Sequence, residues 1–192
     1  MQLLIIRLFD ILFAIIGLSF LSPVFIVIVI LGIIDTGKPI FYQQRVGQHR
    51  KPFTLIKFRT MKPNTASVGT HLVDSNAITP LGSFLRKTKL DELPQLINVL
   101  LGTMSLVGAR PCLPNQSDLI KVRTKHGVYN HKPGITGLAQ INNIDMSTPK
   151  KLAKIDATMH KNLNICYYFS LILKTIIGQG AGDAAQQKNK KQ

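Results

Sequence analysis

Apolar residues run without a single charge from Ile11 to Ile34. A helix of about 24 apolar residues is long enough to cross a hydrocarbon core of about 30 Å. The run is too long for the hydrophobic part of a signal peptide, so we predict a retained membrane anchor over residues 1–36. Basic residues follow the run closely. The positive-inside rule therefore places the rest of the chain on the cytoplasmic side.

The dipeptide Ser22-Pro23 lies near the middle of this apolar run. Pro23 has no backbone N–H and crowds the preceding turn, which favours a kink. The Ser22 hydroxyl can satisfy part of the freed backbone. Two arrangements fit this pattern: a straight span with a tolerated proline, or a helix-break-helix that enters the membrane and returns to the same face. The residues alone leave both open.

Residues 37–177 alternate short β-prone and amphipathic segments, which predicts a cytoplasmic domain of mostly helical α+β type. Two β-prone runs, Ile40–Gln43 and Phe53–Phe58, flank a turn-rich stretch and predict a β-hairpin. Several helical patterns carry basic residues and suit an anionic membrane face. The polar segment 63–75 predicts a loop, and the basic tail 178–192 predicts disorder. Helices are expected within 78–90, 93–101, 117–127, 147–164 and 165–177, with the last resting in the membrane interface, and connections within 105–116 and 131–143.

The formal charge of +15, with only nine acidic residues, indicates that the protein binds anionic partners. Nucleic acid, anionic lipid headgroups and phosphorylated small molecules all qualify. The chain has no Walker loop, no dinucleotide fingerprint and no zinc-binding pattern. Its two cysteines, Cys112 and Cys166, have no metal or redox spacing, which suits a reducing compartment.

The segment Leu90–Gln95 reads LDELPQ, so two acids stand side by side in a basic chain. The simple interpretation is a helix start, because Asp91 suits an N-cap and Pro94 suits the first turn. The helix would then end at Gly102. The alternative is a reacting centre. A helix N-terminus would keep Asp91 ionised at pH 7, so that it can attack phosphorus while Glu92 holds Mg²⁺ against a diphosphate.

Other charged residues can be interpreted either as ordinary surface residues, which is the commoner case, or as parts of a functional site. Strand alternation puts Lys57 and Arg59 on one face, where two cations can bind a phosphate, although solvated surface is the commoner case. Arg110 is the one charge in a Gly/Pro-rich connection. Asp156 is a lone acid among lysines, and most such acids form surface ion pairs.

Four stretches resemble the small monotopic phosphoglycosyl transferases, bacterial sugar transferases that start glycan assembly on polyprenyl phosphate. They read RLFDILFAIIGLSFLSP, FTLIKFRTM, ITPLGSFLRKTKLDELPQLINVLLGTMSLVGARP and KPGITGLAQIN. The resemblance extends from Arg7 to Thr175. It implies a monotopic fold in which Ser22-Pro23 breaks a re-entrant membrane helix. It also implies the bacterial inner membrane as the location, with the catalytic domain on the cytoplasmic face.

The resemblance implies transfer of a phosphosugar from a UDP-sugar to undecaprenyl phosphate, with Mg²⁺ and release of UMP. An N-acetylated amino sugar is the donor that it suggests, and the product would start an O-antigen, capsule, exopolysaccharide or glycoprotein glycan. Asp91 would be the nucleophile that forms a covalent phosphosugar intermediate. Glu92 would bind the metal or help to activate the acceptor. The family positions associated with phosphates and nucleotide are occupied by Lys57, Arg59, Arg86 and Arg110, and Asp156 is the acid expected in the late helix.

One departure concerns Ala109-Arg110-Pro111, where the family usually has Pro-Arg-Pro. We expect Ala109 to loosen the loop that holds Arg110. Three rival functions remain. They are a membrane-tethered nucleic-acid-binding module, a lipid-linked glycosyltransferase that releases UDP, and a noncatalytic membrane scaffold. Few aromatic residues lie among the basic ones, so the first rival lacks stacking platforms and we expect no nucleic-acid partner. The sequence leaves the oligomeric state open, including a homo-oligomer.

Overall fold

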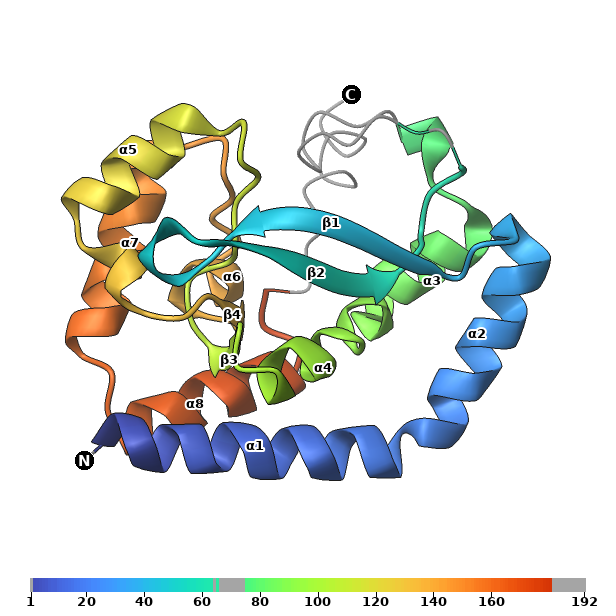
Figure 1. The fold of residues 1–192 in the computed structure, drawn as a ribbon, viewed down its shortest axis with the longest axis horizontal. Helices are drawn as coiled ribbons and strands as arrows, with labels where there is room; N and C mark the ends of the chain where they lie inside the picture. The colour runs from blue at the N-terminus through green and yellow to red at the C-terminus, as the bar shows by residue number, and fades with distance from the viewer. Residues whose placement is uncertain (1, 64, 66–74, 181–192) are drawn as a thin grey trace.

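A computed structural model describes residues 2–63, 65 and 75–180 of the chain (Figure 1). Most of the predicted polar loop 63–75, and the predicted tail from residue 181 onward, lie outside these described residues. Two long helices follow the lower and one lateral edge of the molecule in Figure 1, and a β-hairpin crosses its middle. The remaining helices and two short strands lie on either side of that hairpin.

The two long helices are α1 (Gln2–Phe20) and α2 (Ser22–Thr36), separated by a turn at Leu21. The Ser22 hydroxyl donates to the carbonyl of Ser19, 2.8 Å away. This carbonyl lies four residues before Pro23, which has no N–H to offer it. The serine therefore compensates for the donor that the proline lacks, and the helix-break-helix expected at Ser22-Pro23 is present. We call α1 and α2 the helix pair.

One side of the helix pair is apolar and uncovered. Within the described ranges, α1 is the one helix long and apolar enough to cross a membrane, by length and composition only. Only a few positions of the pair, such as Asp10, Ala14 and Ile28, are buried against the rest of the protein. A continuous apolar surface of this kind marks contact with lipid or another protein. Its exposed members are Leu3, Leu4, Leu8, Leu12, Ile15, Ile16, Phe20, Val24, Ile26, Val27, Ile30, Leu31, Ile33 and Ile34.

The predicted hairpin is confirmed. Strands β1 (Ile40–Val46) and β2 (Pro52–Phe58) pair antiparallel, with Phe41 opposite Lys57. Both strands extend beyond the predicted runs toward the turn. On the inner face Phe53 and Leu55 are buried with Ala14 of α1 and Val99, so the hairpin rests on the helices beneath it.

A second sheet was not predicted. Strands β3 (Ser105–Val107) and β4 (Gly134–Thr136) pair in parallel, although the sequence indicated connections there. Three residues are too few for an alternating pattern to show. A glycine is required at the end of the pair, because a side chain on Gly134 would collide with the backbone of Gly108.

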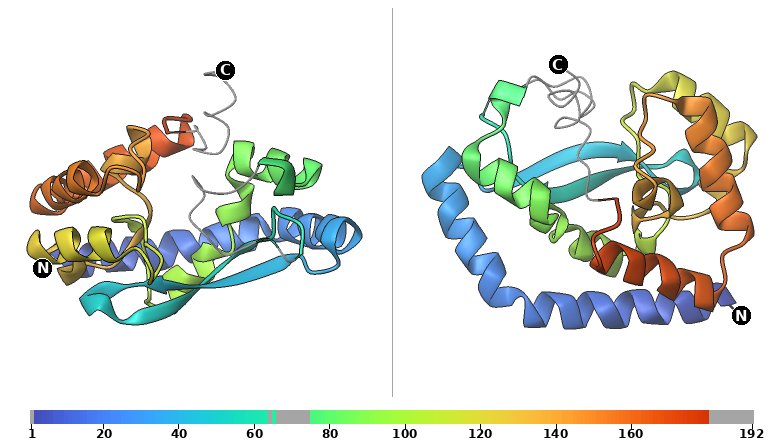
Figure 2. Two further views of the ribbon diagram at one scale, coloured as in Figure 1. Left: turned by 90° about the horizontal axis from the view of Figure 1, so that it is seen from above. Right: turned by 180° about the vertical axis from the view of Figure 1, so that it is seen from behind.

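The predicted helices are all present, with shorter bounds. Gly102 follows α4 at φ 80°, as expected of a residue that ends a helix. Helix α8 contacts α1, with the rings of Phe9 and Phe169 5.0 Å apart, and the right-hand view of Figure 2 shows α8 above α1. The α8 helix was expected to rest in the membrane interface, but its Tyr168 is fully buried in the protein. The predicted helices are α3 (Pro80–Thr88), α4 (Gln95–Leu100), α5 (Ser117–Lys125), α7 (Pro149–Lys161) and α8 (Ile165–Ile176). A short helix, α6 (Leu138–Ile141), lies within 131–143, where the sequence indicated a connection.

The bend of the helix pair can be tested by replacing the proline. Pro23→Ala restores a backbone donor toward the Ser19 carbonyl, so α1 and α2 should straighten and their far ends should separate. Spin labels on the exposed positions Leu4 and Ile34, in a Cys166→Ser background, would report the distance by pulsed electron resonance. Ser22→Ala keeps the proline and should keep the bend. An unchanged distance in Pro23→Ala would show that contacts with the rest of the fold set the bend.

Candidate active site

Asp91 lies in a short 3₁₀ turn, η4 (Leu90–Glu92), and not at the start of an α-helix. Helix α4 begins only at Gln95 and, within the described residues, has no side-chain cap. The predicted capping role of Asp91 is therefore wrong. Lys89 reverses the chain between α3 and η4 with a left-handed backbone, φ 58°. This reversal turns the Asp91 side chain inward, where it is 8% exposed.

Burial changes the ionisation of Asp91. Its pKa is raised to about 7, chiefly by loss of water and secondly by the neighbouring Glu92 carboxylate. Lys57, Arg86 and Arg110 act in the opposite direction and lower it. The expectation that a helix dipole keeps Asp91 fully ionised at pH 7 is thus wrong, because a single 3₁₀ turn replaces the helix and burial outweighs the cations. The group instead changes charge near neutral pH.

Two of the predicted cations reach Asp91 from different elements. Lys57, from β2, is half-buried, and loss of water lowers its pKa to about 8 although Asp91 opposes that shift. Arg86, from α3, is buried, and its Nε donates to the Thr60 hydroxyl at 2.9 Å. The hairpin and α3 therefore deliver positive charge to one buried carboxyl.

Arg59 lies next to this group, on the face that it shares with Lys57. Its guanidinium is 5.1 Å from the centroid of the Phe41 ring, and the Lys57 ammonium is 5.4 Å from the same centroid. The predicted common face is confirmed. The Nε of Arg59 donates to the Lys38 carbonyl at 2.9 Å, so Arg59 is tied to the segment that enters the hairpin.

Arg110 and Glu92 form a close ion pair, with Arg110 Nη2 2.6 Å from Glu92 Oε1. The Arg110 side chain is 47% exposed and the Glu92 side chain 14%. A pair this exposed contributes at most about 1 kcal/mol to stability. Its position matters more, since it brings the segment after β3 onto the turn that carries Asp91.

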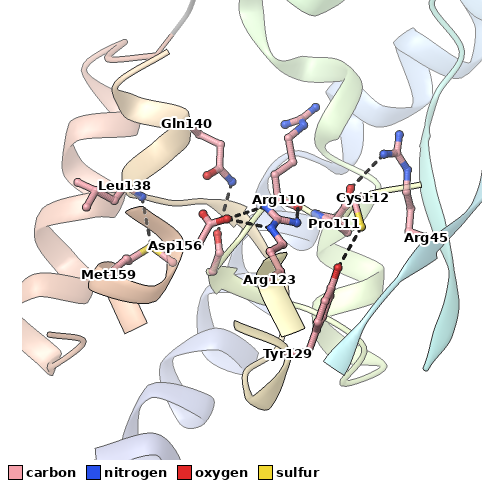
Figure 3. A network of polar contacts seen from close by, with 11 residues as sticks. Arg45, Arg110, Pro111, Cys112, Arg123, Tyr129, Leu138, Gln140, Asp156 and Met159 are labelled. Atoms are coloured by element: carbon pink, nitrogen blue, oxygen red, sulfur yellow. Dashed lines mark hydrogen bonds and ion pairs between the residues drawn. The ribbon is translucent and has the colours of Figure 1, made fainter. Parts of the chain in front are cut away.

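The main chain of the loop around Arg110, which has Ala109 where the family usually has proline, is held by hydrogen bonds. Four consecutive carbonyls of this loop each accept a hydrogen bond. Two of these bonds come from arginine side chains and are drawn in Figure 3. Arg45 of the hairpin, which the sequence did not single out, is one of these donors. The donor–acceptor pairs are Gly134 N to Ala109 O, Arg123 Nη1 to Arg110 O, Arg45 Nη1 to Pro111 O and Val46 N to Cys112 O.

Asp156 is linked to the site indirectly, through Arg123. It is fully buried, and its Oδ2 accepts from Arg123 Nε at 3.0 Å and Nη2 at 2.7 Å. Arg123 lies between Asp156 and the main chain of Arg110, to which it donates at 2.8 Å (Figure 3). The sequence predicted a helix within 117–127 but did not single out Arg123. A signal was present, because Arg123 lies four residues after the buried Leu119, on the same helix face.

The site offers limited but suitable ligands for Mg²⁺. The described residues hold no group of three or more acids, histidines or cysteines that could bind a metal alone. Asp91 and Glu92 are close enough for one to raise the pKa of the other, a repulsion that a divalent cation would relieve. Mg²⁺ commonly binds one or two carboxylates together with substrate phosphates, so the two residues fit this ion.

Comparison with known proteins gives the family. The profile described as bacterial sugar transferase matches residues 1–179. The chain belongs to this family. An uncharacterized sugar transferase of Bacillus subtilis, EpsL, is 38% identical over 186 residues, which are 95% of this chain and 91% of EpsL. Two relatives whose names give an activity are longer than this chain, which covers 30% and 39% of their lengths.

Two of these relatives differ in the sugar that their names give. The UDP-glucose:undecaprenyl-phosphate glucose-1-phosphate transferase of Escherichia coli is 41% identical over 138 residues, 69% of this chain and 30% of that protein. The undecaprenyl-phosphate galactose phosphotransferase of Salmonella typhimurium is 35% identical over 189 residues, 88% of this chain and 39% of that protein.

The buried ion pair of the sugar transferase makes a stability prediction. Arg123→Met leaves the Asp156 carboxylate buried without its partner and should cost about 3–5 kcal/mol of unfolding free energy. Adding Asp156→Leu removes the stranded charge and should recover much of that loss. Urea unfolding followed by circular dichroism would measure both. Equal stability of the single and double variants would show that the two residues are not coupled.

Proposed function

We propose that this sugar transferase moves a sugar 1-phosphate from a UDP-sugar to undecaprenyl phosphate, releases UMP and so starts a membrane-bound glycan. The observation that carries the proposal is a buried acid, Asp91, with a pKa of about 7 among Lys57, Arg86 and Arg110. The names of the relatives support the acceptor. For the donor we propose an N-acetylated amino sugar. A Bacillus subtilis relative that is 44% identical over 111 residues is named as a putative undecaprenyl-phosphate N-acetylgalactosaminyl 1-phosphate transferase, whereas the names of two other relatives give glucose and galactose.

The chemistry assigned to Asp91 is covalent. Its ionised oxygen attacks the phosphorus that bears the sugar, and the bond from that phosphorus to the oxygen of UMP breaks. An acyl phosphate of Asp91 carries the sugar, and UMP leaves with the electron pair. An oxygen of the lipid phosphate then attacks the same phosphorus. The bond to Asp91 breaks, the carboxylate returns, and the sugar stays on a lipid diphosphate.

The cations around Asp91 suit both steps. Each step concentrates negative charge on a phosphoryl group, and fixed positive charge in a site poor in water stabilises that charge strongly. Lys57 and Arg86 are fixed by their strand and by Thr60, so little reorganisation is needed. Arg110 is more exposed and is proposed to contact the nucleotide phosphate, together with Arg59.

Mg²⁺ is the proposed cofactor, held by Glu92 and by the diphosphate of the donor. When bound, it would offset charge on the phosphates. Glu92 also keeps Arg110 in place through its 2.6 Å contact. Asp156 is assigned a supporting role toward the nucleotide-binding loop, through Arg123, in place of direct contact with phosphate.

A monotopic arrangement at the cytoplasmic face of the bacterial inner membrane suits these substrates. The bent helix pair would enter one leaflet and return, with its exposed apolar surface toward lipid. Exposed Phe84, Leu101, Leu173, Ile176 and Ile177 on or beside α3, α4 and α8 would extend that surface as interfacial helices. The lipid phosphate cannot leave the headgroup plane. Holding Asp91 near that plane therefore keeps the phosphosugar close to its acceptor.

The rival functions differ in product and in dependence on Asp91. A lipid-linked glycosyltransferase would release UDP, because the bond broken would be the one between sugar and phosphate. A nucleic-acid-binding module or a scaffold would not need the carboxylate. The burial of Asp91 and of Arg86 favours chemistry at a buried point over binding to an open basic surface.

The nucleophile can be tested directly. In Asp91→Asn the amide cannot form the acyl phosphate, so UMP release from UDP-sugar should fall by about 1000-fold or more. Asp118→Asn, at an exposed acid of α5, is the matched control and should keep activity. A coupled assay that separates UMP from UDP would report the product. Release of UDP, or normal turnover by Asp91→Asn, contradicts the proposal.

The pKa values predict how the first step depends on pH. Below about 7 Asp91 is protonated and cannot attack, so the rate should rise as pH increases through that value. Above about 8 Lys57 loses its charge, so the rate should fall. Single-turnover UMP release measured from pH 5 to about pH 10 should therefore be bell-shaped.

Lys57→Arg provides the control for this profile. Arginine keeps its charge throughout the range, so the alkaline decline should disappear while the acid side remains. An alkaline decline that persists in Lys57→Arg would assign it to another group.

A further inference from the structure

Asp10 is a buried carboxylate in the mostly apolar helix α1. It is 2% exposed, and its Oδ1 accepts three hydrogen bonds. The donors are the Ser105 hydroxyl at 3.1 Å and the Leu106 backbone N–H at 2.9 Å, both on β3, and the Tyr168 hydroxyl of α8 at 2.8 Å. Arg7 Nη1 lies 4.0 Å from its other oxygen. One side chain thus joins α1 to a strand and to a second helix.

Apolar packing cannot fix α1 in the same way. Phe9 and Phe13 contact Phe169 with ring centroids 5.0 and 6.0 Å apart. Lipid tails are as apolar as these rings, so in a membrane such contacts give little preference for one sliding position of the helix over another. Hydrogen bonds to a buried carboxylate are directional, and losing them leaves charge without partners. Asp10 therefore sets the register of α1 against the domain.

Two of the residues that donate hydrogen bonds to Asp10 lie on β3, the strand that precedes the loop with Arg110. Strand β3 ends at Val107, and Arg110 follows three residues later in the loop whose carbonyls are all bound. A second contact joins α1 to α4, because Arg7 Nη2 donates to the Leu100 carbonyl at 3.3 Å. Helix α4 in turn follows the turn that carries Asp91. The helix pair is therefore linked to the two segments that carry Arg110 and Asp91, and these segments are joined to each other by the ion pair of Arg110 with Glu92.

We propose that Asp10 is a positioning residue that sets the height of the site, Asp91 with Arg110, above the membrane surface. This inference rests on the proposed function, in which the two half-reactions use different substrates. The UDP-sugar arrives from solution and is insensitive to that height. The lipid phosphate is confined to the headgroup plane and is sensitive to it. Asp10 therefore governs the second half-reaction and not the first.

The test measures the two half-reactions separately in nanodiscs. The first is the exchange of labelled UMP into UDP-sugar without acceptor, and the second is product formation with undecaprenyl phosphate. Asp10→Ala should slow product formation by about tenfold or more while exchange stays within about twofold, because misplacement acts only where the lipid reacts. Asp10→Asn keeps an acceptor oxygen and should restore most of the loss. Asp35→Ala, at an exposed acid of α2, should change neither.

A depth measurement gives a second readout that does not need turnover. A fluorescent label at the exposed position Thr88, one turn from Asp91 and in a Cys166→Ser background, can be quenched by lipids that carry nitroxides at known depths. Asp10→Ala should alter that quenching profile, and Asp10→Asn and Asp35→Ala should not.

The outcomes separate the two claims. An equal fall of both half-reactions in Asp10→Ala, or an unchanged quenching profile, overturns the positioning role and leaves only a structural one. If the unmodified enzyme forms product without any UMP exchange, the covalent route is wrong. The quenching profile then still decides whether Asp10 sets the height of the site.

Discussion

The balance of charge on the buried Asp91 carboxyl is the constraint on which the rest of the structure depends. Burial and Glu92 favour its neutral form, whereas Lys57, Arg86 and Arg110 favour its anion, and the result is a pKa of about 7. Each cation comes from a different element: β2, α3 and the loop after β3. An exposed aspartate would be fully ionised and hydrated, and one without the cations would remain neutral. The fold therefore serves to bring three separate segments around one turn.

The parts of this fold that the sequence predicted depend on local chemistry. Proline has no backbone N–H donor in any structural context, so the break at Pro23 could be predicted from the sequence. The hairpin and most helices follow from periodicity over many residues. The pair β3–β4 was missed because its strands are three residues long. The turn at Asp91 was mistaken for a helix start, because Asp, Glu and Pro favour both structures.

The remaining features are tertiary and have no local signature. The raised pKa of Asp91 comes chiefly from burial, and the cations that oppose the rise include Lys57 and Arg110, which are distant in sequence. Arg123 and Asp10 belong to residue types that usually face solvent, and each is buried because a partner far along the chain satisfies it. The four bound carbonyls from Ala109 to Cys112 likewise keep the loop in place without the proline that the family usually has. Such compensation is visible only once the elements are packed.

Mass spectrometry of enzyme quenched during the reaction tests the central claim most directly. The account predicts that, with UDP-sugar and Mg²⁺ but no lipid acceptor, the peptide containing Asp91 gains the mass of the phosphosugar. Fragmentation should place that mass on Asp91 and not on Glu92, and adding undecaprenyl phosphate should remove it. Sustained product formation without a modified peptide, or modification at another residue, would contradict the account.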